Sequence, residues 1–67
     1  MTYAELTRHL RRLGCHIARQ GSRHEIWENP AIGRTAAVPR HSGQEIPTGT
    51  LRKILSELGI DPSDLTH

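Results

Sequence analysis

The chain lacks several features that small proteins often use. It has one cysteine (Cys15), no phenylalanine and a single tryptophan in 67 residues. One cysteine excludes an internal disulfide, and the histidines do not show the short paired spacing of structural zinc sites. No apolar run approaches the roughly 18 residues of a membrane span, and the start lacks the pattern of a signal peptide. We therefore expect a cytoplasmic protein with no metal, no other cofactor and no membrane partner.

Length and charge narrow the class of protein further. A chain of 67 residues, 34% of them hydrophobic, closes one small core, so we expect a single domain over residues 1–67. The formal net charge is +2, and Lys53 is the only lysine among nine Lys and Arg. Arginine suits phosphate because its guanidinium is a planar fork of donors. The composition thus permits a nucleic-acid partner without requiring one.

Residues 2–13 have the pattern of an amphipathic helix. Thr2 and Glu5 have the spacing of a capping box, and Gly14 suits a left-handed helix end. The apolar residues recur at steps of three and four: Tyr3, Leu6, Leu10 and Leu13. The opposite face is basic, with Arg8, Arg11 and Arg12. Such a face is more often a solvated helix surface than an RNA contact.

Three short runs after this helix predict an antiparallel meander. They are residues 15–20, 23–29 and 34–39. Gly21 and Ser22 predict a tight two-residue hairpin, and residues 29–33 a longer connection. A second helix is predicted within residues 46–60, with Pro47 at its first position and Gly59 as its cap. The α-β-β-β-α order predicts an α+β fold like that of double-stranded-RNA-binding domains, with a three-stranded sheet covered by two helices on one face.

The middle run raises the question of which face is buried. Alternation puts His24, Ile26 and Glu28 on one face and Arg23, Glu25 and Trp27 on the other. Because both Ile26 and Trp27 are apolar, the pattern does not say which face is inward, although a lone tryptophan more often fills the core. A histidine acts as acid or base near neutral pH. From the pattern alone, a catalytic His24 and a merely packed one are equal alternatives.

Three blocks of sequence resemble the HicA family of toxins, the mRNA interferases of HicAB toxin-antitoxin pairs. They are GSRHEIW at 21–27, NPAIGRTAAVPRH at 29–41 and IPTGTLRKILSELGI at 46–60. The resemblance covers nearly the whole chain and implies the α-β-β-β-α fold. It also implies a toxin that cleaves mRNA with a histidine of the second strand and has a HicB-like antitoxin as its partner. Counted back from the EIW of the first block, this histidine is His24.

The resemblance has one departure, at Arg23. In a common family form the histidine directly follows Gly-Ser, whereas here Arg23 stands between Ser22 and His24. Counting from Gly-Ser would put Arg23 at the site and remove the acid-base group. We align by the strand, because a packed strand fixes register more firmly than a turn. His24 is then the catalytic residue, and Arg23 is an addition to the turn.

The residues around His24 supply candidate contacts with RNA. The amides of Gly21 and Ser22 suit phosphate, although such a dipeptide often serves hairpin geometry alone. Arg23 and Arg40 suit the charge that develops on the attacked phosphate. His41 is either a second acid, a partner contact or a residue that fixes its loop. These residues predict a metal-independent endoribonuclease; the alternatives are a non-catalytic RNA-binding module of the same fold and a pure interaction protein.

Overall fold

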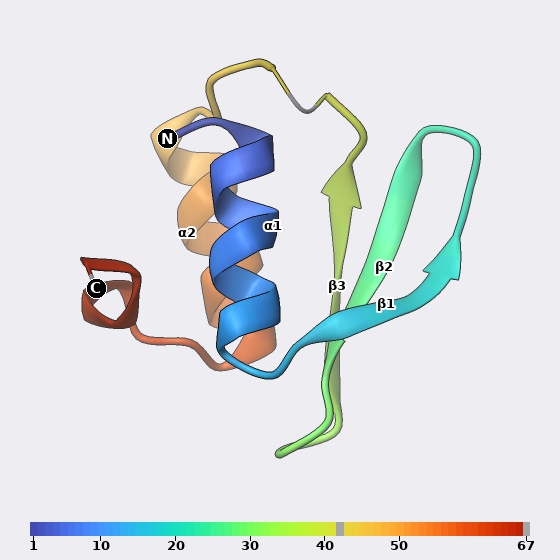
Figure 1. Cartoon of the computed structure of the whole chain (residues 1–67), viewed down its shortest axis with the longest axis vertical. Helices are drawn as coiled ribbons and strands as arrows, with labels where there is room; N and C mark the ends of the chain where they lie inside the picture. The colour runs from blue at the N-terminus through green and yellow to red at the C-terminus, as the bar shows by residue number, and fades with distance from the viewer. Residues whose placement is uncertain (42, 67) are drawn as a thin grey trace.

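The computed structural model describes residues 1–41 and 43–66 and has the predicted order of elements. They are α1 (Tyr3–Arg12), β1 (His16–Gln20), β2 (His24–Asn29), β3 (Arg34–Pro39), α2 (Thr48–Leu58) and the 3-10 helix η1 (Pro62–Thr66). The strands form an antiparallel sheet in the order β1-β2-β3. Both helices lie on one side of this sheet and leave its other face open (Figure 1). The structure therefore confirms the predicted α+β fold.

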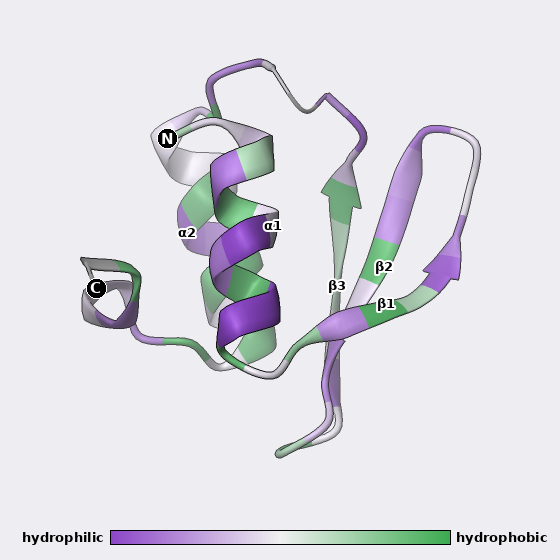
Figure 2. Cartoon of the chain, viewed as in Figure 1, coloured by the Kyte–Doolittle hydropathy of each residue, from purple (hydrophilic) through white to green (hydrophobic). Residues whose placement is uncertain are grey.

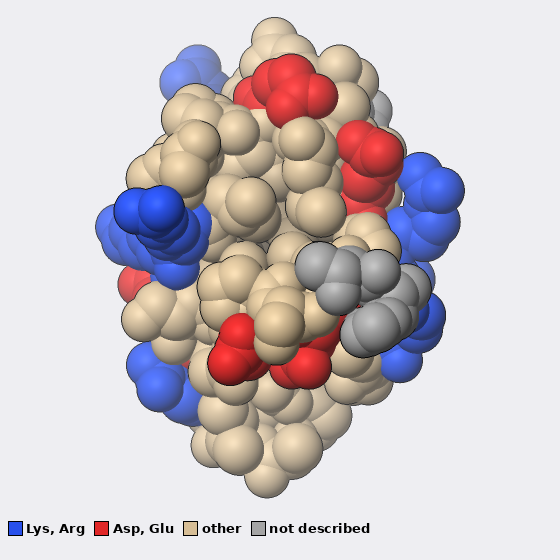
Figure 3. All heavy atoms as spheres, turned by 90° about the vertical axis from the view of Figure 1, so that its left-hand side faces the viewer, with Lys and Arg blue, Asp and Glu red and all other residues tan. Residues whose placement is uncertain are grey.

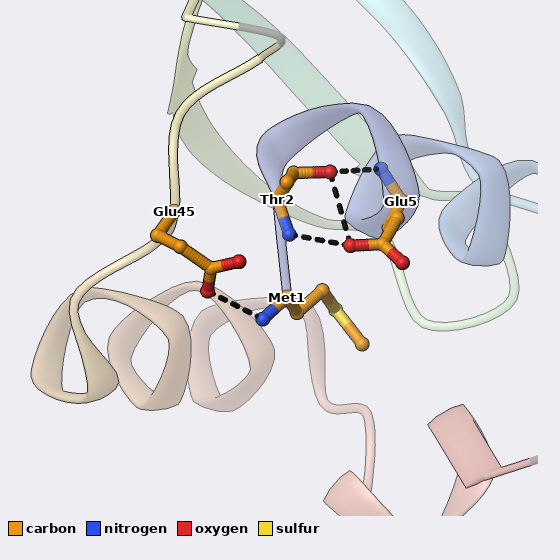
Figure 4. Close-up of polar contacts among 4 residues, drawn as sticks. All are labelled: Met1, Thr2, Glu5 and Glu45. Atoms are coloured by element: carbon orange, nitrogen blue, oxygen red, sulfur yellow. Dashed lines mark hydrogen bonds and ion pairs between the residues drawn. The ribbon is translucent and has the colours of Figure 1, made fainter.

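The start of α1 has the predicted capping box (Figure 4). The Thr2 amide donates to Glu5 Oε1 at 2.8 Å, and the Glu5 amide donates to Thr2 Oγ1 at 3.2 Å. The ammonium group of Met1 donates to Glu45 Oε2 at 2.7 Å. In addition, the Ile46 amide donates to the Met1 carbonyl at 2.9 Å. These contacts tie the start of α1 to the loop that leads into α2.

The core lies between the two helices and the sheet. It is built from apolar side chains of every layer: Tyr3, Leu6 and Leu10 of α1, Trp27, Ala36 and Val38 of the sheet, and Ile54, Leu55 and Leu58 of α2. Figure 2 shows hydrophilic bands along α1 and a more hydrophobic α2 behind it. Trp27 is fully buried, so its face of β2 is the inward one. His24 and Ile26 consequently lie on the open face of the sheet.

The turn between β1 and β2 lies one residue further along the chain than predicted. Gln20 is the last residue of β1 and pairs with Glu25, so Gly21 faces His24 and the tip consists of Ser22 and Arg23. The Gly21 amide donates to the His24 carbonyl at 2.8 Å and closes the turn. The tip therefore has two residues, as predicted, but they are Ser22 and Arg23 rather than Gly21 and Ser22. Strand alternation, which placed Arg23 on the face opposite to His24, does not reach into the turn, because β2 begins at His24.

A β-bulge in β1 changes the face on which Arg19 lies. The register shifts between Ile17 and Arg19, so that Ile17 pairs with Trp27 and Arg19 pairs with Ile26. In a regular strand Ile17 and Arg19 would share one face. Here Ile17 shares the inward side with Trp27, whereas Arg19 lies on the open side with Ile26. The bulge thus brings an arginine to the face that carries His24.

The second helix begins one residue later than predicted and ends as predicted. Pro47 has φ −56° and ψ 141°, which is not helical, and α2 starts at Thr48. At the other end Gly59 has φ 67°, and the Ile60 amide donates to the Leu55 carbonyl at 2.9 Å. Neither helix of the described ranges is long and apolar enough to cross a membrane.

Candidate functional site

His24 lies at the end of the sheet where β1 ends, β2 begins and β3 ends. It is the first residue of β2, pairs with Pro39 and is exposed. Among residues 1–41 and 43–66, no side-chain hydrogen bond engages its imidazole. Both ring nitrogens are therefore available to a ligand. An exposed imidazole with free ring nitrogens can exchange protons with a bound ligand.

A hollow on the open face contains His24, and we call it the open-face hollow. Its lining consists of Arg19, Gly21, Ser22, Arg23, His24 and Ile26. The structure therefore brings four of the predicted site residues together: Gly21, Ser22, Arg23 and His24. Of the side chains that the structure describes here, two are arginines and none is a carboxylate. Unopposed guanidinium groups beside an exposed imidazole favour an anionic ligand such as phosphate.

Arg40, which follows β3, supports the turn between β1 and β2 that lines this hollow. Its amide donates to the Arg23 carbonyl at 3.0 Å, and its Nη1 donates to the Gly21 carbonyl at 3.1 Å. Arg40 Nε also lies 3.9 Å from Glu25 Oε2. Glu25 is anchored in turn, because its Oε1 accepts from Trp27 Nε1 at 3.1 Å. A chain of contacts therefore runs from the buried tryptophan to the turn that precedes His24.

His41 belongs to a second hollow, the helix-side hollow, between α1 and the same end of the sheet. Its lining includes Tyr3, Thr7, Arg11, Glu25, Arg40 and His41. The rings of His41 and Tyr3 meet edge to face, with centroids 6.2 Å apart. The structure does not bring His24 and His41 into one hollow. Arg40 is the link between them, since it lines the helix-side hollow and bonds to a residue of the open-face hollow.

Sequence reasoning missed three residues of this region. Arg19 reaches the open face only through the bulge in β1, which nothing in the sequence indicates. Glu25 was assigned no role, although a carboxylate on the same strand face as a buried tryptophan is a signal that it has a partner. Arg11 lies with its guanidinium carbon 5.1 Å from the centre of the Trp27 ring, a cation–π contact. A basic face on a helix does not by itself reveal such a contact.

The remaining histidine, cysteine and acidic side chains bear on whether the described residues hold a metal site or a reactive thiol. No group of three His, Cys, Asp or Glu side chains suited to a metal occurs in the described part of the chain. Burial raises the pKa of the Cys15 thiol, which favours the unreactive protonated form. His16 Nε2 lies 3.0 Å from Glu28 Oε1, so this imidazole, unlike that of His24, has a protein partner.

The side of the molecule away from the sheet has a different charge pattern. Figure 3 shows carboxylates in the middle of this side, with Lys and Arg along both flanks. Carboxylates repel phosphate, so this side is poorly suited to a nucleic acid. The arginines of the open-face hollow are instead gathered around His24.

The fold and the site together define a small α+β domain that presents a histidine between arginines on an open sheet face. The family described as "HicA toxin of bacterial toxin-antitoxin" matches residues 3–60 of the 67-residue chain. The chain therefore belongs to the HicA toxin family, as its sequence blocks predicted. It is accordingly a toxin of a toxin-antitoxin pair, and such a pair implies an antitoxin partner. Among curated proteins, none matches the chain.

Proposed function

We propose that this HicA toxin is a metal-independent endoribonuclease that cleaves mRNA in the cytoplasm at the open-face hollow. One observation carries the proposal: His24 is exposed, without a protein partner among the described residues, in a hollow that it shares with Arg19 and Arg23. Cleavage of RNA without a metal requires a group that exchanges protons and cations that balance the charge of phosphate. This hollow supplies both.

The proposed reaction uses the 2′-hydroxyl of RNA as its nucleophile. A base removes the 2′-hydroxyl proton, the oxygen attacks the adjacent phosphorus, and the bond from phosphorus to the 5′-oxygen breaks as an acid protonates that oxygen. The products carry a 2′,3′-cyclic phosphate and a 5′-hydroxyl. His24 performs one of the two proton transfers, because imidazole is present in both protonation states near neutral pH. The second transfer involves water or another group.

The arginines and the turn hold the phosphate. Arg19 and Arg23 flank His24 and stabilise the extra negative charge of the five-coordinate phosphorus through charge-assisted hydrogen bonds. The exposed Gly21 and Ser22 lie beside them and supply contacts to the RNA backbone. Arg40 donates a hydrogen bond from Nη1 to the Gly21 carbonyl and therefore acts mainly by fixing the turn. His41 contacts the RNA from the helix-side hollow.

The antitoxin is proposed to neutralise the toxin by covering His24 and the arginines around it. Because the open-face hollow has arginines and, among the described residues, no carboxylate, an acidic segment of a HicB-like protein complements it. Carboxylates of that segment would take the positions of the RNA phosphates. Binding of antitoxin and binding of RNA are then mutually exclusive.

A cleavage assay tests the enzymatic proposal. A labelled single-stranded RNA is incubated in excess EDTA with the wild type, with His24→Ala and with Arg23→Ala, and the product ends are identified. We expect cleavage by the wild type, a weaker activity of Arg23→Ala and none of His24→Ala. Activity of His24→Ala together with loss in Arg23→Ala would show that Arg23 occupies the family site. Products with 5′-phosphate ends would exclude attack by the 2′-hydroxyl.

The same proteins separate cleavage from mere binding. If the chain is a non-catalytic RNA-binding module, the wild type binds the RNA, with log affinity falling linearly against log salt, and leaves it intact. If it is only an interaction protein, it does neither. Our proposal requires both binding and cleavage by the wild type, and it requires that His24→Ala still binds.

A further inference from the structure

The helix-side hollow is lined by charged and aromatic side chains rather than by aliphatic ones alone. It is a space of ≈ 340 Å³, near the lower end of the roughly 300–1,000 Å³ of ligand pockets. Cationic and aromatic groups from distant parts of the sequence line it: Arg11 and Tyr3 come from α1, and Arg40 and His41 follow β3. The hollow is thus large enough for one small polar ligand.

The charge of this hollow favours an anion with a flat, aromatic part. Glu25 is the one carboxylate among its described lining residues, and it already accepts from Trp27 and lies near Arg40. Arg11 and Arg40 retain further donors, because a guanidinium has five N–H groups. The exposed His41 ring offers a surface for stacking. A phosphate linked to a base has both of the chemical parts that these groups accept.

The position of the hollow connects it with the proposed cleavage site. His24 and Glu25 are consecutive in β2, so they point to opposite faces of the sheet at the same end. His24 lines the open-face hollow and Glu25 the helix-side hollow. Arg40 lies between them, since it contacts both Glu25 and Gly21. A strand of RNA that leaves His24 can therefore pass over Arg40 into the helix-side hollow.

We propose that the helix-side hollow binds one unpaired nucleotide of the RNA, adjacent to the phosphate that lies at His24. The nucleotide places its base against His41 and its phosphate between Arg11 and Arg40. This inference rests on the proposed function, because it takes the open-face hollow as the place of the scissile phosphate. It restricts the substrate to single-stranded RNA, since a base held in a duplex cannot enter the hollow.

The test fills the hollow without removing any of its polar groups. Ala4 is exposed on α1 and lines the hollow, so Ala4→Leu occupies the space of the nucleotide. Ala31→Leu is the matched control, because Ala31 is also exposed but lies in the turn at the other end of the sheet. The probe is a fluorescent single-stranded 2′-O-methyl RNA, which lacks the 2′-hydroxyl and cannot be cut by the proposed reaction. Dissociation constants are measured at one fixed salt concentration.

We expect Ala4→Leu to bind this RNA roughly tenfold more weakly than the wild type, the size of one lost stacked base. Ala31→Leu should bind as the wild type does. His41→Ala, an exposed loop substitution that leaves the core intact, should weaken binding in the same direction and guards against a misfolded Ala4→Leu protein. Wild-type affinity of both Ala4→Leu and His41→Ala would overturn the proposal. An equal loss in Ala31→Leu would overturn it as well.

The helix-side hollow could instead bind a protein, and the same variants distinguish a protein ligand from a nucleotide. If Ala4→Leu loses affinity for the co-expressed antitoxin but keeps its affinity for RNA, the hollow is a protein contact and our proposal is wrong. The result also differs from a failure of the proposed function. A wild type that never cleaves RNA, yet binds it more tightly than Ala4→Leu, would refute the enzyme and leave the nucleotide site standing.

Discussion

The two turns of the sheet lie at opposite ends of β2 and are built in opposite ways (Figure 1). In the turn after β2, the side chain of Asn29 donates to the Leu58 carbonyl at 2.8 Å, and its backbone carbonyl accepts from the Gly33 amide at 2.9 Å. This turn uses its own residues to hold the end of α2. The turn before β2 is closed by its own backbone bond from Gly21 to His24, but its side-chain support comes from Arg40, which lies outside the turn.

This difference explains how one end of a small sheet becomes free for function. Where a turn is fixed by its own side chains, those side chains are occupied and have little left for a ligand. Where Arg40 fixes the turn instead, Ser22, Arg23 and His24 remain exposed. The cost is that the site depends on a contact between distant residues, which a single substitution can remove.

The largest expected effect is on the rate of RNA cleavage, and it is tested by one substitution at each end of β2. We expect His24→Gln to lower the rate of RNA cleavage by roughly 10²–10⁴-fold, because it removes the acid-base group. Its free energy of unfolding should stay within about 0.5 kcal/mol of the wild type, because His24 is exposed. Asn29→Ala should destabilise the protein by about 1–2 kcal/mol, since it uncaps the Leu58 carbonyl, and should cleave normally when folded. Urea unfolding and cleavage assays on both variants provide the measurement; a His24→Gln protein that is as active as Asn29→Ala would erase the contrast.

A smaller effect is expected from Arg40, which holds the turn before β2. Arg40→Gln should lower kcat roughly tenfold, the scale of one hydrogen bond from a charged donor. KM should change little if Arg40 acts through the turn. The matched control is Arg34→Gln, since Arg34 is exposed at the other end of β3. A rise in KM with a shallower dependence on salt would instead show that Arg40 binds a phosphate directly.

The turn after β2 can be tested at Gly59, where α2 ends. Gly59 has φ 67°, a conformation that costs other residues roughly 1–2 kcal/mol, and a Cβ at this position would meet Cδ1 of Ile32. We expect Gly59→Ala to be less stable by at least that amount, because the clash adds to the backbone strain, and to cleave RNA normally when folded. The double variant with Ile32→Ala removes the clash and isolates the backbone strain. Reduced cleavage by folded Gly59→Ala would show that the two ends of the sheet are coupled.

Much of the fold could be predicted from the sequence because its signals are local. The spacing of Thr2 and Glu5 predicted the capping box, and Gly59 predicted the end of α2; both are confirmed. The buried face of β2 could not be decided, because Ile26 and Trp27 are adjacent apolar residues. Packing against the helices decides it, since only Trp27 is fully buried.

The candidate site was only partly predictable, for a related reason. The sequence block around Gly21 and His24 identified the residues that are neighbours in the chain. The place of Arg19 depends on a bulge, and the bond from Arg40 to Gly21 joins residues 19 positions apart. Such contacts follow from tertiary structure, which no local pattern encodes. The sequence likewise named His41 without showing that it lines a different hollow from His24.

The smallest expected effect concerns the capping box at the start of α1, to which the loop between β3 and α2 is tied. It follows from the lowered pKa of Glu5. The backbone amide and the hydroxyl of Thr2 donate to the Glu5 carboxylate and hold the pKa of Glu5 below its ordinary value. A carboxyl with a lowered pKa in the folded state stabilises the protein above its ordinary pKa, and this stabilisation is lost as the pH falls through the lowered value. We therefore expect Glu5→Gln to be slightly less stable than the wild type at neutral pH, and the difference to vanish in acid. Urea unfolding of both proteins from roughly pH 2 to 7 measures it. A difference that persists in acid would mean that the charge of Glu5 is not its source, and slower cleavage by the folded variant would show that the site turn depends on the start of α1.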